Sequence, residues 1–155
     1  KFPIILASSF YAVMQLSSMF GRIFLGIISD KIFNSRIVLF MLGILSFISL
    51  NFLSTLNFQP SNLYMYLIVS LIGISVASWN GLFMAEVSVI SKDYDISEST
   101  SASTFFTFLS YMLSPPLFAG VIFLTNFKIA FLIFSLFGLL ASFSILYIFV
   151  MEKNK

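Results

Sequence analysis

The 155-residue chain is poor in charge and lacks two reactive residue types. Only 9% of its residues are Asp, Glu, Lys or Arg, whereas soluble domains carry about a quarter. It has no cysteine and no histidine, which excludes disulfides, thiolate nucleophiles, imidazole bases and the usual ligands of zinc, haem and iron–sulfur clusters. Its net charge of +2 is too small for a surface that follows nucleic-acid phosphates. The sequence therefore predicts no cofactor, no metal, no nucleic-acid partner and no enzyme activity.

Apolar residues dominate instead. Hydrophobic residues make up 59% of the chain, aromatic residues 18%, and the mean hydropathy is +1.06. A membrane-spanning helix needs about 20 mostly apolar residues, and backbone groups in lipid must be paired within the chain. The sequence predicts an all-α polytopic membrane protein whose residues 1–155 form five spans, at about 4–28, 37–56, 63–90, 100–124 and 129–150.

The positive charges predict an orientation. With five spans, the connections 29–36 and 91–98 and the end 152–155 share one side of the membrane. That side carries Lys31, Arg36, Lys92, Lys153 and Lys155, and the other side carries Lys1 and Lys128. Because Lys and Arg collect in the cytoplasm, we expect the N-terminus outside and the C-terminus in the cytoplasm.

The first span carries a polar stripe at helical spacing. Its members are Tyr11, Gln15, Ser18, Arg22, Gly26 and Ser29. Arg22 lies eight residues before Asp30, about 12 Å into the span at 1.5 Å per residue. One interpretation places Arg22 on a cavity or a neighbouring helix, as intramembrane ions usually are. The other lets its long side chain reach back to the headgroups. On the first interpretation, Arg22, Gln15, Ser18 and Tyr11 are candidate substrate-binding residues.

The third span holds two further candidates. Glu86 lies about one turn from its inner end, where it acts either as a proton carrier or as the fixed partner of a Lys or Arg at that end. Trp79 lies at mid-span and belongs either to the core or to a substrate-stacking site. The third and fifth spans also carry rows of small residues that favour close helix packing. These are Gly73, Ala77, Gly81 and Ala85, and Ser135, Gly138 and Ser142.

The fourth span opens with serines and contains two adjacent prolines. Ser97 or Ser99 is expected to cap the helix. Pro115 and Pro116 remove backbone donors, which predicts a kink or a break in the outer half of this span.

The connection between the first two spans resembles a known motif. Gly26-Ile27-Ile28-Ser29-Asp30-Lys31-Ile32-Phe33-Asn34-Ser35-Arg36 is similar to the signature loop of the major facilitator superfamily, G-x-x-x-D-R/K-x-G-x-R/K-R/K. Gly26, Asp30, Lys31 and Arg36 match, whereas Phe33 and Ser35 depart from it. In that family a degraded copy of the loop joins helices eight and nine. Trp79-Asn80-Gly81-Leu82 with Ala85-Glu86 looks like the tenth helix, and Ser114 to Gly120 looks like the eleventh.

The resemblance implies helices eight to twelve of a twelve-helix secondary transporter that works by alternating access, and a partial C-terminal domain whose N-terminal half is missing from this chain. It implies a cytoplasmic gate formed by Gly26, Asp30, Lys31, Arg36 and Glu86. Gly21-Arg22 is similar to oxalate and monocarboxylate transporter members, in which an Arg on the eighth helix meets the substrate carboxylate. The implied partners are a small solute, a carboxylate in that branch, and the lipid of a bacterial inner membrane.

A second hypothesis keeps the five spans and assigns no solute. The chain is then a non-catalytic helical subunit of a membrane complex, a class in which five spans and this composition also occur. The two hypotheses differ in what precedes Lys1, because a transporter requires about seven more hydrophobic segments.

Overall fold

The computed structural model describes residues 3–55, 61–93 and 95–153, and this part of the chain is helical throughout apart from its connections. The elements are α1 (Ile4–Lys31), α2 (Ser35–Thr55), α3 (Asn62–Val76), α4 (Trp79–Ile90), a short 3-10 turn η1 (Ser91–Asp93), α5 (Ile96–Leu124) and α6 (Phe127–Lys153). Five stretches are long and apolar enough to cross a membrane: Ile4–Lys31, Ser35–Thr55, Asn62–Ile90, Ile96–Leu124 and Phe127–Met151. The predicted all-α, five-span class is confirmed.

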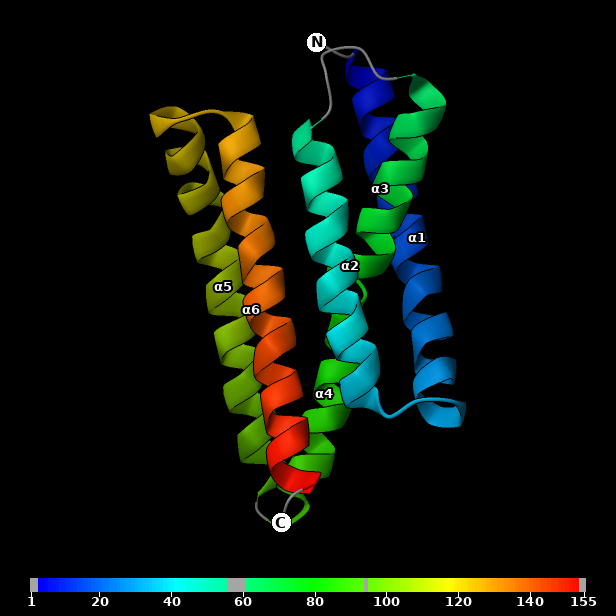
Figure 1. The fold of residues 1–155 in the computed structure, drawn as a ribbon, viewed down its shortest axis with the longest axis vertical. Coiled ribbons are helices and arrows are strands. Elements are labelled where there is room, and N and C mark those ends of the chain that lie inside the picture. Colours follow the sequence, from blue (N-terminus) through cyan, green and yellow to red (C-terminus); the bar gives the residue numbers. More distant parts are fainter. Residues whose placement is uncertain (1–2, 56–60, 94, 154–155) are drawn as a thin grey trace.

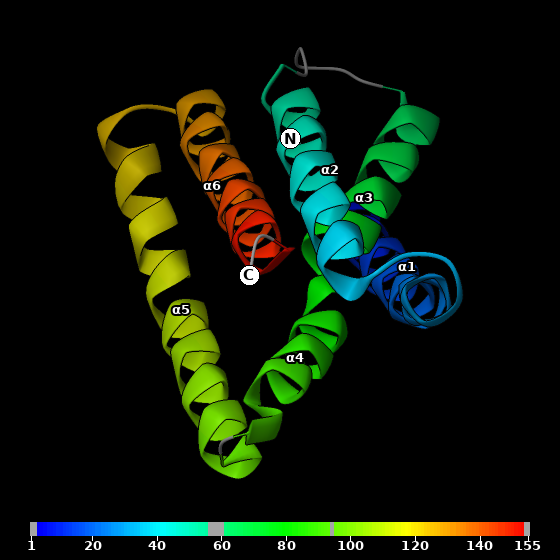
Figure 2. The same cartoon turned by 60° about the horizontal axis from the view of Figure 1, so that its bottom comes forward.

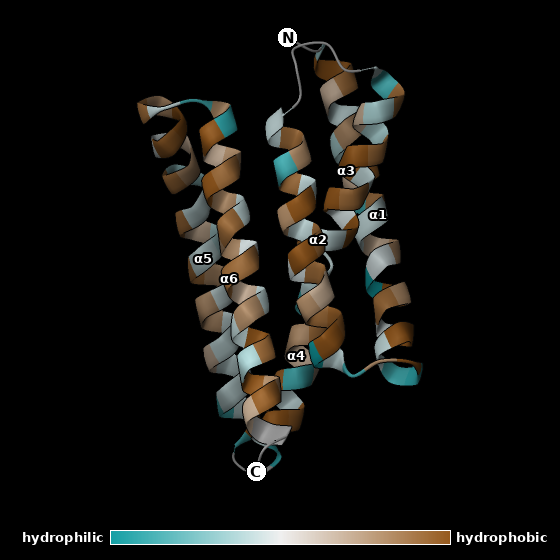
Figure 3. Ribbon diagram, in the orientation of Figure 1, coloured by the Kyte–Doolittle hydropathy of each residue, from teal (hydrophilic) through white to brown (hydrophobic). Residues whose placement is uncertain are grey.

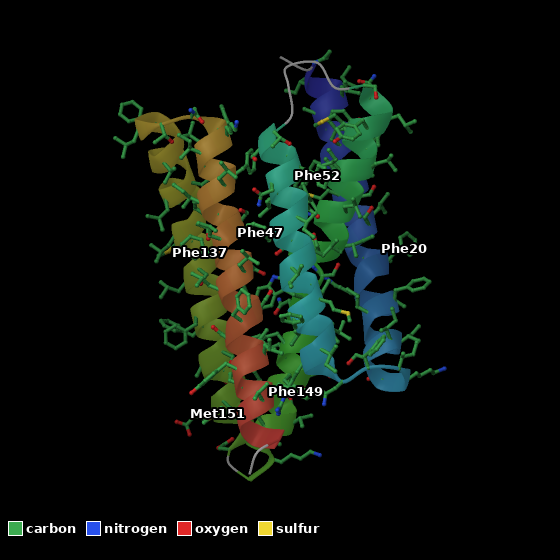
Figure 4. All side chains as sticks on the ribbon, in the orientation of Figure 1. Phe20, Phe47, Phe52, Phe137, Phe149 and Met151 are labelled. Carbon is green, nitrogen blue, oxygen red and sulfur yellow. The ribbon has the colours of Figure 1, made fainter. Side chains whose placement is uncertain are left out.

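The two ends of the chain lie at opposite ends of the bundle (Figure 1). We call the end that holds the α1–α2 turn, η1 and the C-terminus the lower end. Hydrophilic residues gather near the two ends, and apolar residues cover most of the length between them (Figure 3). Phe20, Phe52 and Phe137, labelled in Figure 4, are 60%, 52% and 60% exposed. Such an apolar outer surface suits lipid rather than water.

Helices α2 and α6 pack along small residues. A Cβ placed on Gly43 would lie 2.0 Å from Ser142 Oγ and 2.8 Å from the Gly138 carbonyl oxygen. Ser135 and Ser142 are fully buried, and Asn51 donates from Nδ2 to Ser135 Oγ at 3.0 Å. The predicted packing role of Ser135, Gly138 and Ser142 is confirmed, because only small side chains admit this approach.

Helices α1 and α3 approach each other equally closely. A Cβ on Gly73 would lie 2.2 Å from the Met14 carbonyl oxygen. A Cβ on Gly81, in the same predicted row, would meet nothing within 4 Å. The row therefore packs against α1 in α3 and loses that contact in α4.

Helix α5 shows what became of the two features noted in the sequence. It runs unbroken through Pro115 and Pro116, so of the predicted kink or break the break is absent. The ladder resumes after the prolines and still holds at its end, where Thr125 N donates to the Val121 carbonyl at 2.9 Å. In lipid such continuity is favoured, since each freed backbone group is costly. The cap is Asp95 rather than a serine: its Oδ1 accepts from Ser97 N at 2.8 Å and from Glu98 N at 3.1 Å.

The apolar core and the open side of the bundle lie in different places. The core cluster joins α2 to α4 and consists of Val38, Leu39, Leu42 and Leu82. Helices α4 and α5 meet at η1 and diverge from it (Figure 2). Thr107 is the one buried residue of α5, and Phe118 contacts Phe131 and Phe134 of α6, so most of the remaining surface of α5 within the described chain is open to lipid or a further helix.

Candidate functional site

The third span is broken near its middle, which the sequence did not predict. Helix α3 ends at Val76 and α4 begins at Trp79. Ala77 has φ −107° and ψ −6°, and Ser78 has φ −98° and ψ −11°, values near the sparsely populated bridge region of backbone space. The break exposes carbonyl groups at the end of α3 that have no partner within the helix.

Helix α1 supplies the missing partners at this break. Ser18 Oγ donates to the Ala77 carbonyl oxygen at 3.1 Å, and Arg22 Nη2 donates to the same oxygen at 3.2 Å. In return, Ser78 Oγ lies 3.1 Å from the carbonyl oxygens of both Ser18 and Gly73. Ser18 and Ser78 are each 1% exposed. A Cβ on Gly21 would lie 2.5 Å from Ser78 Oγ, so glycine at this position leaves room for the serine.

The Arg22 guanidinium points toward the middle of the span. Its acceptor, Ala77, is shared with Ser18, which lies one turn farther from the Lys31 end of α1. A positive charge at the C-terminal end of α3 is also favoured by the helix dipole. Within the described residues the guanidinium makes this hydrogen bond only and pairs with no carboxylate. An intramembrane cation without a counterion marks a functional site by default.

An open surface cavity of about 330 Å³ adjoins this group. It is lined by Gln15, Ser18, Met19, Arg22 and Ile23, all on α1, and all of these residues except Ser18 are exposed within the described chain. Gln15 donates from Nε2 to Tyr11 Oη at 2.7 Å, so Tyr11 reaches the cavity only through Gln15. Three of the predicted substrate-binding residues, Gln15, Ser18 and Arg22, thus share one wall, and Tyr11 lies behind them.

Trp79 lies elsewhere. It packs against the core cluster, and its ring centroid is 5.5 Å from that of Phe83 in an edge-on arrangement. It also lines a second cavity, of about 310 Å³, together with Phe83, Ser103, Phe106, Thr107, Ser110 and Tyr111. Both interpretations of Trp79 therefore have a structural counterpart, but the tryptophan does not share a cavity with Arg22. The polar residues that line this second cavity include Ser103, Thr107 and Ser110 of α5.

The candidate gate residues lie at the lower end, and two of them are in contact. Arg36 Nε donates to Glu86 Oε1, and the two side chains are 13% and 12% exposed. Asn34 Oδ1 accepts from Arg36 N at 3.0 Å, which caps α2 and fixes where the arginine enters the helix. Glu86 is therefore placed as an ion-pair partner in this structure.

The remaining gate candidates are not joined to that pair. Asp30 and Lys31 are exposed and make no ion pair within the described residues. A Cβ on Gly26 would meet no atom within 4 Å.

One buried polar atom escaped the sequence reasoning altogether. Asn80 Oδ1, in the first turn of α4, is buried and has no hydrogen-bond partner among the described residues. An amide next to the break is a polar signal in the sequence, but hydropathy alone treats it as part of a span.

Comparison of the chain with models of known protein families, with curated proteins and with solved structures finds no match.

Proposed function

We propose that this chain is part of a secondary transporter of the major facilitator type that moves a small organic anion by alternating access. The observation that carries the proposal is the Arg22 guanidinium, which has no carboxylate partner in the described chain and lines a cavity of about 330 Å³ beside Gln15 and Ser18. In a low-dielectric site a guanidinium binds a carboxylate through two parallel charge-assisted hydrogen bonds. Gln15 and Ser18 add neutral hydrogen-bonding groups for the rest of the solute.

The lower end then acts as the cytoplasmic gate. The Arg36–Glu86 pair ties the start of α2 to the end of α4, while Asp30 and Lys31 remain exposed there. Open space at Gly26 suits the close approach of a helix from the missing N-terminal half. On this proposal the membrane is the bacterial inner membrane, with the N-terminus of the chain outside and the C-terminus in the cytoplasm, as the distribution of Lys and Arg favours.

Uptake by the complete gene product in proteoliposomes tests this function. Labelled oxalate, lactate and other small carboxylates are offered to the wild type and to Arg22→Ala, Arg22→Lys and Lys128→Ala. Charged hydrogen bonds contribute about 1.5–3 kcal/mol, so Arg22→Ala is expected to lower uptake about 10- to 100-fold. Uptake by Arg22→Lys should lie between these two values, because the lysine ammonium keeps the charge but cannot donate two parallel hydrogen bonds to a carboxylate. Lys128→Ala removes an exposed charge at the other end and leaves uptake unchanged. Equal uptake by wild type and Arg22→Ala discards Arg22 as a solute ligand.

The alternative, a helical subunit of a membrane complex, draws on α5. Only Thr107 of this helix is buried within the described chain, which is what a helix that packs against another subunit would show. That function predicts that the purified protein accumulates none of these solutes by itself, and that it purifies with partner chains.

A further inference from the structure

The break between α3 and α4 has no proline at it, although Ser78, Asn80 and Gly81 there are weak helix formers. Ala77 and Ser78 stand at the break, and neither is a proline or a glycine. Alanine is the best helix former of all. The start of α4 is not stabilised by a side-chain cap either. Ser78 makes no cap hydrogen bond to α4, and its hydroxyl instead contacts the carbonyls of Ser18 and Gly73. The Ser78 contact with Gly73 is local to the bend, whereas three further contacts, with Ser18 and Arg22, come from α1.

Two donors on α1 hold the break, and only one of them is exchangeable. Ser18 is 1% exposed and enclosed between the helices. Arg22 is exposed and lines the cavity next to the break. Its acceptor at Ala77 is a neutral carbonyl at 3.2 Å. A carboxylate is a stronger acceptor for a guanidinium, because it carries the opposite charge and can accept two parallel N–H bonds. An anion in the cavity thus competes with Ala77 for the same guanidinium.

We propose that Arg22 is an exchangeable cap that links the occupancy of the α1 cavity to the bend between α3 and α4. This inference rests on the proposed function, because it takes the solute to be an anion. In the empty state Arg22 caps the end of α3 and stabilises the bend. When an anion takes the guanidinium, the Ala77 carbonyl loses this donor, and the α3–α4 segment shifts toward a continuous helix.

Such a shift is felt at the lower end of the bundle. Helix α3 packs closely on α1 through Gly73 and meets α2 where Ser75 Oγ donates to Ser49 Oγ, while the lower half, α4, is joined to α2 through the core cluster and the Arg36–Glu86 pair. A change in the bend therefore moves the α4 end relative to the α1–α3 pair. A ligand shifts such an equilibrium only by its differential affinity for the two states, and exchange of the Arg22 acceptor supplies that difference.

Distance measurements between spin labels on α3 and α4 test the cap. Leu67 and Val89 are 58% and 52% exposed, so Leu67→Cys and Val89→Cys place labels without disturbing the packing. The sequence has no native cysteine, and any cysteine elsewhere in the complete gene product is replaced by serine. In lipid nanodiscs, Arg22→Ala is expected to lengthen the distance, toward the ~33 Å that this separation spans in a continuous helix. Millimolar guanidinium ion should restore the wild-type distance. Lys128→Ala, the matched control, leaves it unchanged. An unchanged or shorter distance in Arg22→Ala overturns the proposal.

Measuring the same label distance with and without solute separates this inference from the proposed function. The labelled protein with wild-type Arg22 is measured with the carboxylate that proteoliposomes accumulate, and its distance should shift in the same direction as in Arg22→Ala. Uptake without a shift leaves the transport function standing and overturns the coupling. If no carboxylate is accumulated, the proposed function falls and takes the coupling with it, while the Arg22→Ala distance still decides whether Arg22 holds the break.

Discussion

Arg36, in the first turn of α2, donates its Nε–H to the Glu86 carboxylate near the end of α4. Both side chains are largely enclosed, at 13% and 12% exposure. Glu86 lies one turn beyond Leu82, and Arg36 lies two residues before Val38, so the ion pair sits beside the core cluster that joins the same two helices. The ion pair thus links α2 and α4 at the lower end of their apolar interface.

Removing one partner of this pair should destabilise the protein more than removing both. Arg36→Met removes the guanidinium that the Glu86 carboxylate contacts, and Glu86→Gln removes the carboxylate that Arg36 Nε contacts. Breaking a buried pair costs about 3–5 kcal/mol. We expect about 1–3 kcal/mol here, because both groups keep some exposure and because the unfolded state in the membrane also offers them partners. The free energies of unfolding are measured by SDS titration in mixed micelles, with the double variant completing the cycle. Strictly additive losses in the double variant would show that the two residues do not interact.

Gly73 should be intolerant of any side chain. The Cβ of Gly73→Ala would lie 2.2 Å from the Met14 carbonyl oxygen and 3.1 Å from Ser17 Cβ, and the backbone oxygen has no free rotation to escape. Overpacking of this kind costs about 1–3 kcal/mol. The same SDS titration measures the loss.

Gly81→Ala is the matched control for Gly73. It lies in the same row of small residues, and its Cβ would meet nothing within 4 Å. Alanine exceeds glycine in helix propensity by about 0.8–1 kcal/mol, so Gly81→Ala should be neutral or stabilising. Equal losses at the two positions would contradict the close α1–α3 contact.

The orientation of the bundle is open to direct labelling. Lys128 lies in the first turn of α6 at the upper end, and Lys31 ends α1 at the lower end. Because Lys and Arg favour the cytoplasmic side, Lys128→Cys should react with a membrane-impermeant maleimide on intact cells, and Lys31→Cys should react only after the membrane is opened. External labelling at Lys31→Cys would show the opposite orientation and would contradict the proposed cytoplasmic gate.

The helical class and the spans were predictable because lipid leaves few alternatives. Because backbone groups in lipid must be paired, each long apolar stretch is expected to be a helix. The helix ends lie within a few residues of their predicted positions. Close packing at Gly138 and Ser142 followed from residue size, whereas the identity of the partner helix, α2, did not. The cap of α5 was missed because Asp95 and the serines after it are all good capping residues, and only the backbone path selects among them.

The break at Ala77 and Ser78 was unpredictable for a different reason. No proline marks the position, and the contacts that hold the bend come in part from Ser18 and Arg22 on another helix. Glu86 was expected near the positive residues of the lower end, yet the choice of Arg36 over Lys31 depends on how α2 and α4 pack. Trp79 was placed in a candidate site by its mid-span position, but the turn of α4 directs it toward α5 and away from Arg22.

Equilibrium binding of a carboxylate solute and its uncharged amide analogue to wild type and Arg22→Ala tests the central claim most directly. Isothermal titration in nanodiscs gives the dissociation constants. If Arg22 is the anion ligand, the carboxylate should bind the wild type about 10- to 100-fold more tightly than Arg22→Ala, at about 1.4 kcal/mol per tenfold change, and the amide should bind both proteins equally weakly. Equal carboxylate affinity in the two proteins would contradict the account.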